Sequence, residues 1–167
     1  MMHESRTRRR WPIVALALAS SCAFATSVQL GAWWTSGAVE IGPFGSRWCS
    51  GGECRAAGLR WLDGSELWLR GAIATGAAGL VATLFLVALA GATAAGPKPN
   101  ATELNYVARL AAKASLAALA TAIVVGAWFV IGFPGAGDAH LDRGAILYAL
   151  AIPLGAIAAV QALRWKT

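Results

Sequence analysis

The chain has 167 residues, which is enough for one domain, and 57% of them are hydrophobic whereas only 13% are charged. A soluble core of this size cannot bury so much apolar surface, and the charged share is about half that of ordinary soluble domains. The net charge of +6 does not indicate nucleic-acid binding, because the basic residues stand at the ends of apolar segments rather than in a patch interleaved with aromatic residues. These properties predict a membrane protein, with the lipid bilayer as its first partner.

Four segments contain no Asp, Glu, Lys, Arg or His: residues 11–39, 71–97, 114–137 and 144–163. Each reaches or exceeds the roughly 20 residues that a helix needs to cross the hydrocarbon of a bilayer. The sequence therefore predicts an all-α transmembrane fold, a four-helix bundle in a single domain over residues 1–167. The predicted spans cover about residues 11–30, 69–92, 104–131 and 144–163, with a long outer loop at 31–67.

The charges between the predicted spans indicate which side of the membrane each loop occupies. With the N-terminus inside, the inner segments hold nine basic and two acidic residues, whereas the outer loops hold five basic and six acidic residues. Lys and Arg of short loops are retained on the cytoplasmic side. The sequence therefore predicts a multi-pass protein of the cell (inner) membrane with both termini in the cytoplasm.

The first predicted span has one alternative interpretation. Its basic start, the apolar run from Pro12 and the triplet Ala23-Phe24-Ala25 together resemble a cleavable signal peptide, and cleavage after Ala25 would leave three spans. The apolar stretch continues through Leu30 to Trp34, a length that an uncleaved span needs and a signal peptide does not. We therefore expect an uncleaved helix.

The tryptophans at the ends of the predicted spans are expected to lie at headgroup depth. Their rings combine an apolar body with one polar N–H, which favours the membrane interface. Trp33, Trp34 and Trp68 are placed at the outer interface on this basis, and Trp11 and Trp165 at the inner one.

The predicted outer loop contains one cysteine pair, Cys49 and Cys54. An oxidising compartment outside the cytoplasm lets thiols pair, and the intervening Ser-Gly-Gly permits a tight reversal that brings two Cα atoms within bridging distance. Residues 38–41 alternate as a strand does, and residues 59–62 do so in part. We expect a small antiparallel hairpin or sheet with a disulfide near its tip; a redox-active pair and two free thiols are the alternatives.

Small residues recur at four-residue spacing on the last two predicted spans: Ala114, Ala118, Ala122 and Gly126 on the third, and Ala151, Gly155 and Ala159 on the fourth. This spacing lets helix backbones approach closely. We expect these residues to pack inside the bundle, and a dimer face is the alternative.

No catalytic, cofactor-binding or metal-binding constellation is evident in the sequence. Charged residues are missing from the middle of every predicted span, which disfavours ion or proton transport. Both histidines, His3 and His140, lie outside the spans, so no haem ligands are available between helices. The segment 138–142, with two aspartates beside His140, is expected to be a solvated turn rather than a metal site. We expect a protein that is not an enzyme and has no cofactor.

The arrangement resembles the claudin and peripheral-myelin-protein class: four spans, a long first outer loop, a short second one and a tryptophan beside a cysteine pair. Trp34 would stand for that class's first loop tryptophan, residues 45–48 loosely for its Gly-Leu-Trp element, and Cys49 and Cys54 for its cysteines. The cysteines stand closer together here, and the leucine is missing. Residues 51–55 match a Gly-Gly-Glu-Cys-Arg-like element of bacterial four-span proteins.

The resemblance implies a small outer sheet held by one disulfide, which makes contacts between membranes or neighbouring molecules. We therefore expect a non-enzymatic envelope protein whose outer loop contacts a protein partner or another copy, with Trp34, Trp48 and Trp61 as contact candidates. The first alternative is an accessory subunit of a transporter or membrane enzyme that packs through the small-residue ridge of the third span. A thiol–quinone redox protein is disfavoured, because such oxidases need two cysteine pairs, whereas this chain has one pair and Cys22, which we expect to be buried between helices.

Overall fold

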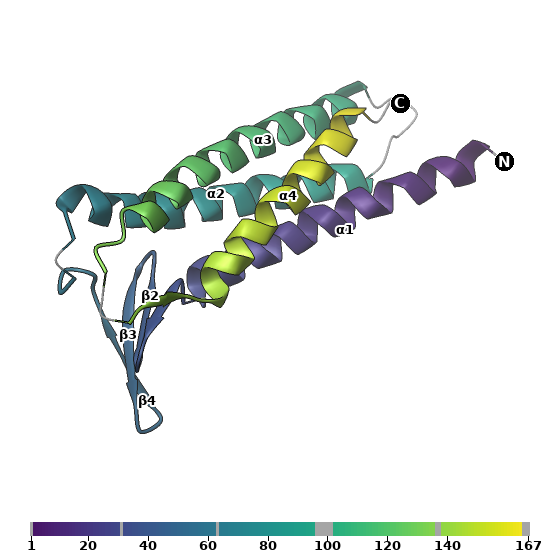
Figure 1. Ribbon diagram of the computed structural model, residues 1–167. Coiled ribbons are helices and arrows are strands. Elements are labelled where there is room, and N and C mark those ends of the chain that lie inside the picture. The colour runs from purple at the N-terminus through teal and green to yellow at the C-terminus, as the bar shows by residue number, and fades with distance from the viewer. Residues whose placement is uncertain (1, 31, 63, 96–101, 136–137, 165–167) are drawn as a thin grey trace.

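The computed structural model describes residues 2–30, 32–62, 64–95, 102–135 and 138–164, which form four long helices and a small sheet (Figure 1). The helices are α1 (Met2–Gln29), α2 (Glu66–Ala95), α3 (Thr102–Ile131) and α4 (Arg143–Arg164). The strands are β1 (Trp34–Ser36), β2 (Val39–Gly42), β3 (Gly45–Ser50), β4 (Glu53–Ala57) and β5 (His140–Leu141).

Each helix contains a segment that is long and apolar enough to cross a membrane. These segments are Arg10–Gln29, Glu66–Ala95, Tyr106–Ile131 and Arg143–Arg164. The ends of these segments lie within three residues of the ends of the predicted spans. The reason is that the charged residues on either side of each apolar stretch also mark where the helix, or its apolar part, begins and ends.

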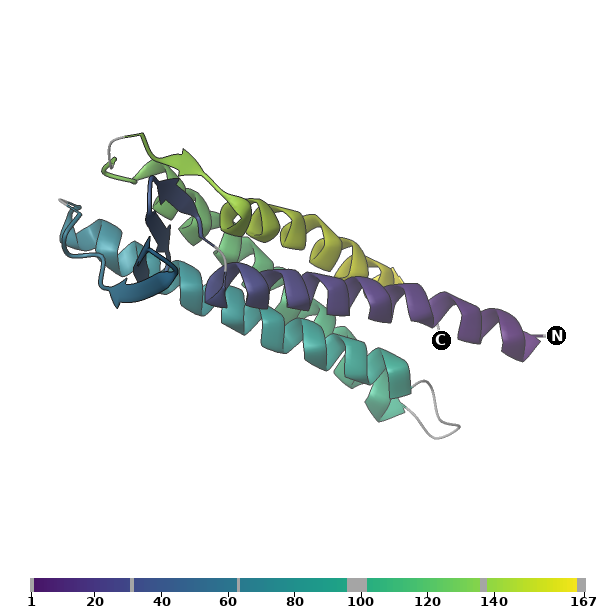
Figure 2. The same ribbon diagram turned by 90° about the horizontal axis from the view of Figure 1, so that it is seen from below.

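The helices form an up-and-down bundle in which each packs on its sequence neighbours and α1 also packs on α4 (Figures 1 and 2). At the end that carries the sheet, α2 extends beyond the last turn of α1 and the first turn of α4 in both views.

Small side chains bring the helices together in the middle of the bundle, as predicted for an intramolecular packing face. Ala122, Ala151 and Ala159 are fully buried, and Ala118 is nearly so, whereas Ala114 is only half-buried. The two glycines of the predicted ridges meet neighbouring helices directly. A Cβ atom added at Gly155 would lie 2.8 Å from the Ser20 hydroxyl and 3.2 Å from Leu86 and Leu119, and one added at Gly126 would lie 3.0 Å from the Tyr148 ring.

The sheet has five antiparallel strands in the order β4-β3-β2-β1-β5. The predicted hairpin is present: Cys49 and Cys54 are register partners in β3 and β4, they form a disulfide, and Gly51 and Gly52 turn the chain between them with φ of 60° and 88°. Positive φ at both positions is the requirement of a tight two-residue hairpin turn, which glycine meets without steric cost.

Two features of the sheet differ from expectation. Residues 59–62 form a turn, closed by a hydrogen bond from the Leu62 N–H to the Leu59 carbonyl, and not a strand. Leu59 and Leu62 are both buried, and their spacing of three suits a turn rather than the alternation of a strand. The second difference is β5, which comes from the second outer loop and pairs with β1.

Candidate functional site

The two faces of the sheet are chemically different. Thr35, Glu40, Arg47 and Ala56 are successive register partners across four strands and therefore share one face, which we call the polar face. The next row contains Trp34, Ile41, Ser46 and Ala57 and belongs to the opposite face, which we call the apolar face. Each face contacts a different part of the bundle.

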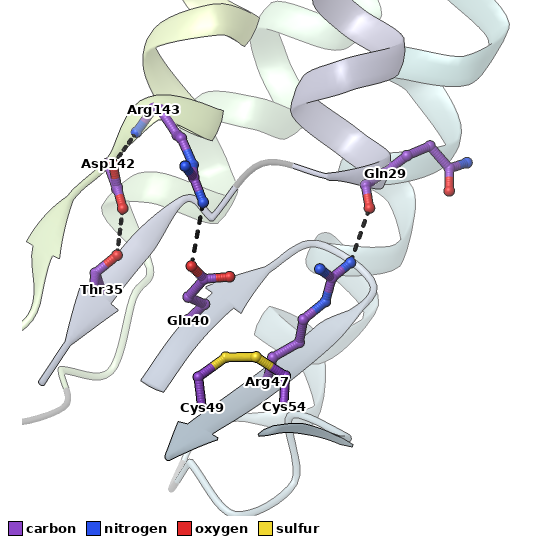
Figure 3. A network of polar contacts seen from close by, with 8 residues as sticks. All are labelled: Gln29, Thr35, Glu40, Arg47, Cys49, Cys54, Asp142 and Arg143. Atoms are coloured by element: carbon purple, nitrogen blue, oxygen red, sulfur yellow. Dashed lines mark hydrogen bonds and ion pairs between the residues drawn. A yellow bond between two sulfur atoms is a disulfide. The ribbon is translucent and has the colours of Figure 1, made fainter. Parts of the chain in front are cut away.

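The polar face is joined to the ends of α1 and α4 by hydrogen bonds (Figure 3). The Thr35 hydroxyl donates to Asp142 Oδ2, and Arg143 Nη2 donates to Glu40 Oε1 at 3.3 Å. Arg47 Nη2 donates at 3.2 Å to the carbonyl of Gln29, the last residue of α1. A carbonyl at the end of a helix has no partner within that helix, so Arg47 caps α1.

Asp142 is the N-cap of α4 as well as a partner of the sheet. Its Oδ1 atom accepts a hydrogen bond from the backbone N–H of Arg143, at the positive end of the helix dipole. The hydrogen bond from Thr35, followed by the one from the Arg143 N–H, holds the pKa of Asp142 below its ordinary value of 3.8. The carboxylate therefore stays charged at any pH near neutrality.

Backbone hydrogen bonds strap the second outer loop to the first. The Asp142 N–H donates to the Trp33 carbonyl at 2.9 Å, and the Gly144 N–H donates to the Ala32 carbonyl at 2.6 Å. A Cβ at Gly144 would lie 2.5 Å from that carbonyl oxygen, so only glycine permits this approach. The strap fixes the start of α4 against the segment that links α1 to β1.

The apolar face covers a layer of aromatic side chains at the sheet end of the bundle. Trp34 stacks on Phe133 with 4.3 Å between ring centroids, and Trp68 stacks on Phe129 at 5.2 Å. Trp33 packs against Phe129 at 5.3 Å. We call these five residues the aromatic layer.

The aromatic layer corrects the expected place of three tryptophans. Trp33, Trp34 and Trp68 are 1%, 4% and 2% exposed, so they are interior packing residues and not interfacial anchors. Trp68 also donates its indole N–H to the Phe129 carbonyl at 3.0 Å, near the end of α3. Burial removes Trp34 from the surface that a partner could contact. Trp11 is exposed on α1, and Trp165 lies outside the described residues.

Beyond the bundle, β3 and β4 project as a hairpin with little cover, which we call the projecting hairpin (residues 45–57; Figure 1). Every residue of β4 is exposed, and Trp48 of β3 is 63% exposed. Trp61, at 49% exposed, donates its indole N–H at 2.8 Å to the Ser46 hydroxyl, which lies on the same face as Trp48. Two of the three contact candidates are thus available at one side of the hairpin.

The outer edge of β4 carries backbone groups that no strand of the described residues pairs with. The Cys49 N–H donates to the Ala38 carbonyl, which lies on the β2 side of β3. Cys49 and Cys54 are therefore a non-hydrogen-bonded pair, in which the backbone N–H and C=O groups of each residue point away from the other strand. The N–H and C=O groups of Cys54, and of Ala56 two residues further, therefore point to the outer edge. Such an edge is a template for another strand.

Cys22 lies where the sequence did not place it. It is exposed on α1, within the segment that is apolar enough to cross a membrane, and is not buried between helices. Among the described residues, no group of three or more His, Cys, Asp and Glu side chains is arranged to hold a metal ion. The loop residue Asp142 is engaged with Thr35 and the start of α4 instead.

Sequence reasoning missed the residues of the polar face and two of the five residues of the aromatic layer. Asp142 stands directly before an apolar helix, so an N-cap preference was available as a signal. Thr35 and Glu40 gave no local signal, because their partners lie about one hundred residues away. Phe129 and Phe133 stand four residues apart at the end of α3 and were hidden among other apolar residues.

No protein-family model matches this sequence, and no curated protein matches it either.

Proposed function

We propose that the chain is a non-enzymatic multi-pass membrane protein with both termini in the cytoplasm, and that its projecting hairpin binds a second copy of the chain. The observation that carries the proposal is the outer edge of β4, with which no strand of the described residues pairs, on a hairpin that a disulfide closes. The four apolar helices and disulfide-bonded sheet are compatible with a claudin-like layout.

The ends of the apolar segments support the proposed membrane placement. The sheet and its charged residues Glu40, Arg47 and Arg143 stand at one end of the bundle, outside the apolar segments or at their boundary. The excess of basic residues at the opposite end favours a cytoplasmic location for that end. The disulfide fits an oxidising outer compartment.

Charge complementarity selects one register for pairing two β4 edges. If Cys54 lies opposite the partner's Cys54 in an antiparallel pair, Glu53 of each copy lies opposite Arg55 of the other, which gives two ion pairs. If Arg55 lies opposite the partner's Arg55 instead, the two guanidinium groups face each other and repel. The first register also uses the outward backbone groups of Cys54 as a hydrogen-bonded pair.

The test is energy transfer between copies carrying donor and acceptor fluorophores at their C-termini, in vesicles at low protein density. Glu53→Arg and Arg55→Glu should each weaken association roughly tenfold, because each change turns two attractive pairs into two repulsive ones. The double variant Glu53→Arg/Arg55→Glu restores the pairing and should recover most of the association. Arg60→Glu makes the same change of charge outside β4 and should have little effect.

Equal association of all four variants would contradict pairing through β4. Labelling of vesicles from cells with a membrane-impermeant maleimide tests the topology separately, in a Cys22→Ser background. Cys49 and Cys54 should react only from the extracytoplasmic side and only after reduction; labelling from the cytoplasmic side alone would contradict the orientation.

The accessory-subunit alternative requires a surface other than the predicted ridge. Ala118 and Ala122 are buried inside the bundle and meet no outside protein in this conformation. A partner would have to contact outward residues of α3 such as Val124 or Trp128, which are 68% and 52% exposed. Co-purification of a protein that depends on these residues, with unchanged association of the β4 variants, would favour the subunit.

A further inference from the structure

A cavity of about 180 Å³ lies between the end of α1 and the sheet. Its walls are Val28 and Gln29 of α1, Leu30 after the helix, residues 40–42 of β2, the β2–β3 turn with Phe44, and Arg47 and Ala56 of the next two strands. A cavity of about 150 Å³ can hold a benzene ring, so this one has room for a polar group of similar size.

In the proposed membrane placement, the cavity lies at the depth of lipid headgroups. Ser20, Leu86, Leu119 and Gly155 meet in one layer of the bundle, and Ser20 is midway between Arg10 and Leu30. Gln29 lies nine residues beyond Ser20, about 14 Å along the helix, where half of a 30 Å hydrocarbon core ends.

Phe44, in the turn between β2 and β3, contacts the neighbouring helix α2 at the same depth. Its ring rests on Gly76 of α2, where an added Cβ would come within 2.5 Å of it, and Gly76 lies ten residues from Leu86. Phe44 and Leu30 are nevertheless 51% and 64% exposed. The cavity therefore has exposed apolar side chains at the level where acyl chains begin.

The cavity carries one anionic and one cationic side chain side by side. Glu40 and Arg47 are register partners on the polar face, and both line the cavity. Their contacts with Arg143 and Gln29 use one carboxylate oxygen and one terminal nitrogen, so further acceptor and donor positions remain on each (Figure 3).

We propose that this cavity binds the headgroup of a phosphatidylethanolamine-type lipid of the outer leaflet. Arg47 donates to the phosphate, for which a guanidinium is well suited, and Glu40 accepts from the primary ammonium. The acyl chains descend past Leu30 and Phe44. A choline headgroup has no N–H to donate to Glu40, and a glycerol headgroup has no ammonium. The proposal rests on the membrane placement proposed above and not on association between copies.

The test uses the purified protein in detergent at a concentration where it is monomeric, with lipid binding measured by native mass spectrometry. The wild type should bind phosphatidylethanolamine roughly tenfold more tightly than phosphatidylglycerol or phosphatidylcholine, the effect of one charge-assisted hydrogen bond. Glu40→Gln should remove this preference, and Arg47→Gln should weaken binding of all three lipids. Arg60→Gln removes the same charge from the turn after β4, away from the cavity walls, and should bind as the wild type does.

Ala56→Leu gives an independent variant, because it fills the cavity without changing a charge and should also abolish the preference. Wild-type protein that does not discriminate among the three lipids, or a preference that survives both Glu40→Gln and Ala56→Leu, would overturn the proposal. The last experiment adds soluble glycerophosphoethanolamine as a competitor for the cavity. If it displaces phosphatidylethanolamine at the same concentration as the lipid, the site binds a free headgroup, and the lipid assignment is overturned. Because association between copies is measured separately, either proposal can fail without the other.

Discussion

The two ends of the outer sheet are built from the same kind of strand and yet differ in almost every contact. At the β1 end, Trp34 is buried in the aromatic layer, and backbone hydrogen bonds tie the adjoining segment to the start of α4. At the β4 end, every residue is exposed, and the described residues provide no strand beyond it. A single sheet therefore contains an anchored part that belongs to the core and a projecting part that does not.

This difference shows that whether a side chain of the outer loop is exposed depends on its position in the sheet and not on its residue type. Trp33 and Trp34 are interior residues, whereas Trp48, only fourteen residues after Trp34, is largely exposed. The disulfide stands at the projecting end, where packing is weakest. A covalent link there replaces the constraint that side-chain burial provides at the anchored end.

The largest expected effect is the loss of a tryptophan from the anchored end. Trp33→Ala should lower the free energy of unfolding by about 3–5 kcal/mol, because it leaves a large cavity against Phe129 and Tyr148. Trp48→Ala removes the same side chain from the projecting end and should cost about 0.5 kcal/mol or less. Denaturant titration of the purified protein, followed by loss of helix content, measures both.

Trp33→Phe is the matched control, because it keeps an aromatic ring and removes an indole N–H that has no hydrogen-bond partner among the described residues. It should cost clearly less than Trp33→Ala. A cost for Trp48→Ala equal to that of Trp33→Ala would break the distinction between the two ends.

The second effect concerns the disulfide and should remain local. Cys49→Ser/Cys54→Ser should destabilise the projecting hairpin by about 2 kcal/mol, the value expected for a short closed loop. Amide hydrogen exchange should quicken in β3 and β4, while the protection of α1 and α4 stays unchanged. Faster exchange throughout the bundle would show that the hairpin supports the core.

A third, smaller effect tests the cap of α4. Asp142→Ala should lower stability by about 1 kcal/mol, because it removes an acceptor for the Arg143 N–H and for the Thr35 hydroxyl. Asp142→Asn keeps an acceptor for the N–H and should cost less. Thermal unfolding in detergent, monitored by circular dichroism, distinguishes the two variants.

Asp142 also gives the anchored end a pH dependence with a defined sign. Its pKa is lower in the folded protein than the ordinary value of 3.8, so the carboxylate stabilises the fold fully above that value. The stabilisation is lost as the pH falls below 3.8 towards the lower folded pKa. The stability difference between the wild type and Asp142→Asn should therefore shrink on acidification; a difference that grows would contradict the assignment.

The smallest expected effect is the ion pair between Arg143 and Glu40. Both side chains are partly exposed, at 64% and 29%, so the coupling between them should be about 0–1 kcal/mol and should fall with added salt. A double-mutant cycle with Arg143→Gln and Glu40→Gln measures it, in lipid-free detergent. The pair Glu66–Arg70, which is 80% and 77% exposed, is the reference and should couple less strongly.

Much of the fold was predictable because each of the four helices contains a long uninterrupted apolar segment, long enough to cross a membrane. The four spans and the hairpin at Cys49 and Cys54 follow from local features: missing charges for the helices, and two glycines between cysteines for the turn. Of the residues in the predicted small-residue ridges, Gly155 meets Ser20, Leu86 and Leu119 within the chain.

The remaining features depended on partners far away in sequence. An interfacial tryptophan and a buried one have the same local surroundings in the sequence. The burial of Trp34 and Trp68 therefore could not be predicted without knowing that Phe129 and Phe133 lie beside them. The two residues of β5 are too short a segment to predict without β1. Cys22 was misplaced because a span composed mainly of small and apolar residues does not indicate which side faces outward.

The strap between Trp33 and Asp142 also determines how a mechanical load would travel through the molecule. A pull on the projecting hairpin passes through β3 and β2 into β1, where it divides between α1, through the chain, and α4, through β5 and the bonds to Trp33 and Ala32. Helices α2 and α3 receive load through the aromatic layer, through the contact of Phe44 with Gly76, and through the chain segments that link β4 to α2 and α3 to β5. Tension applied at the surface would therefore act first on the side of the bundle that α1 and α4 form, and these two helices would move as a pair.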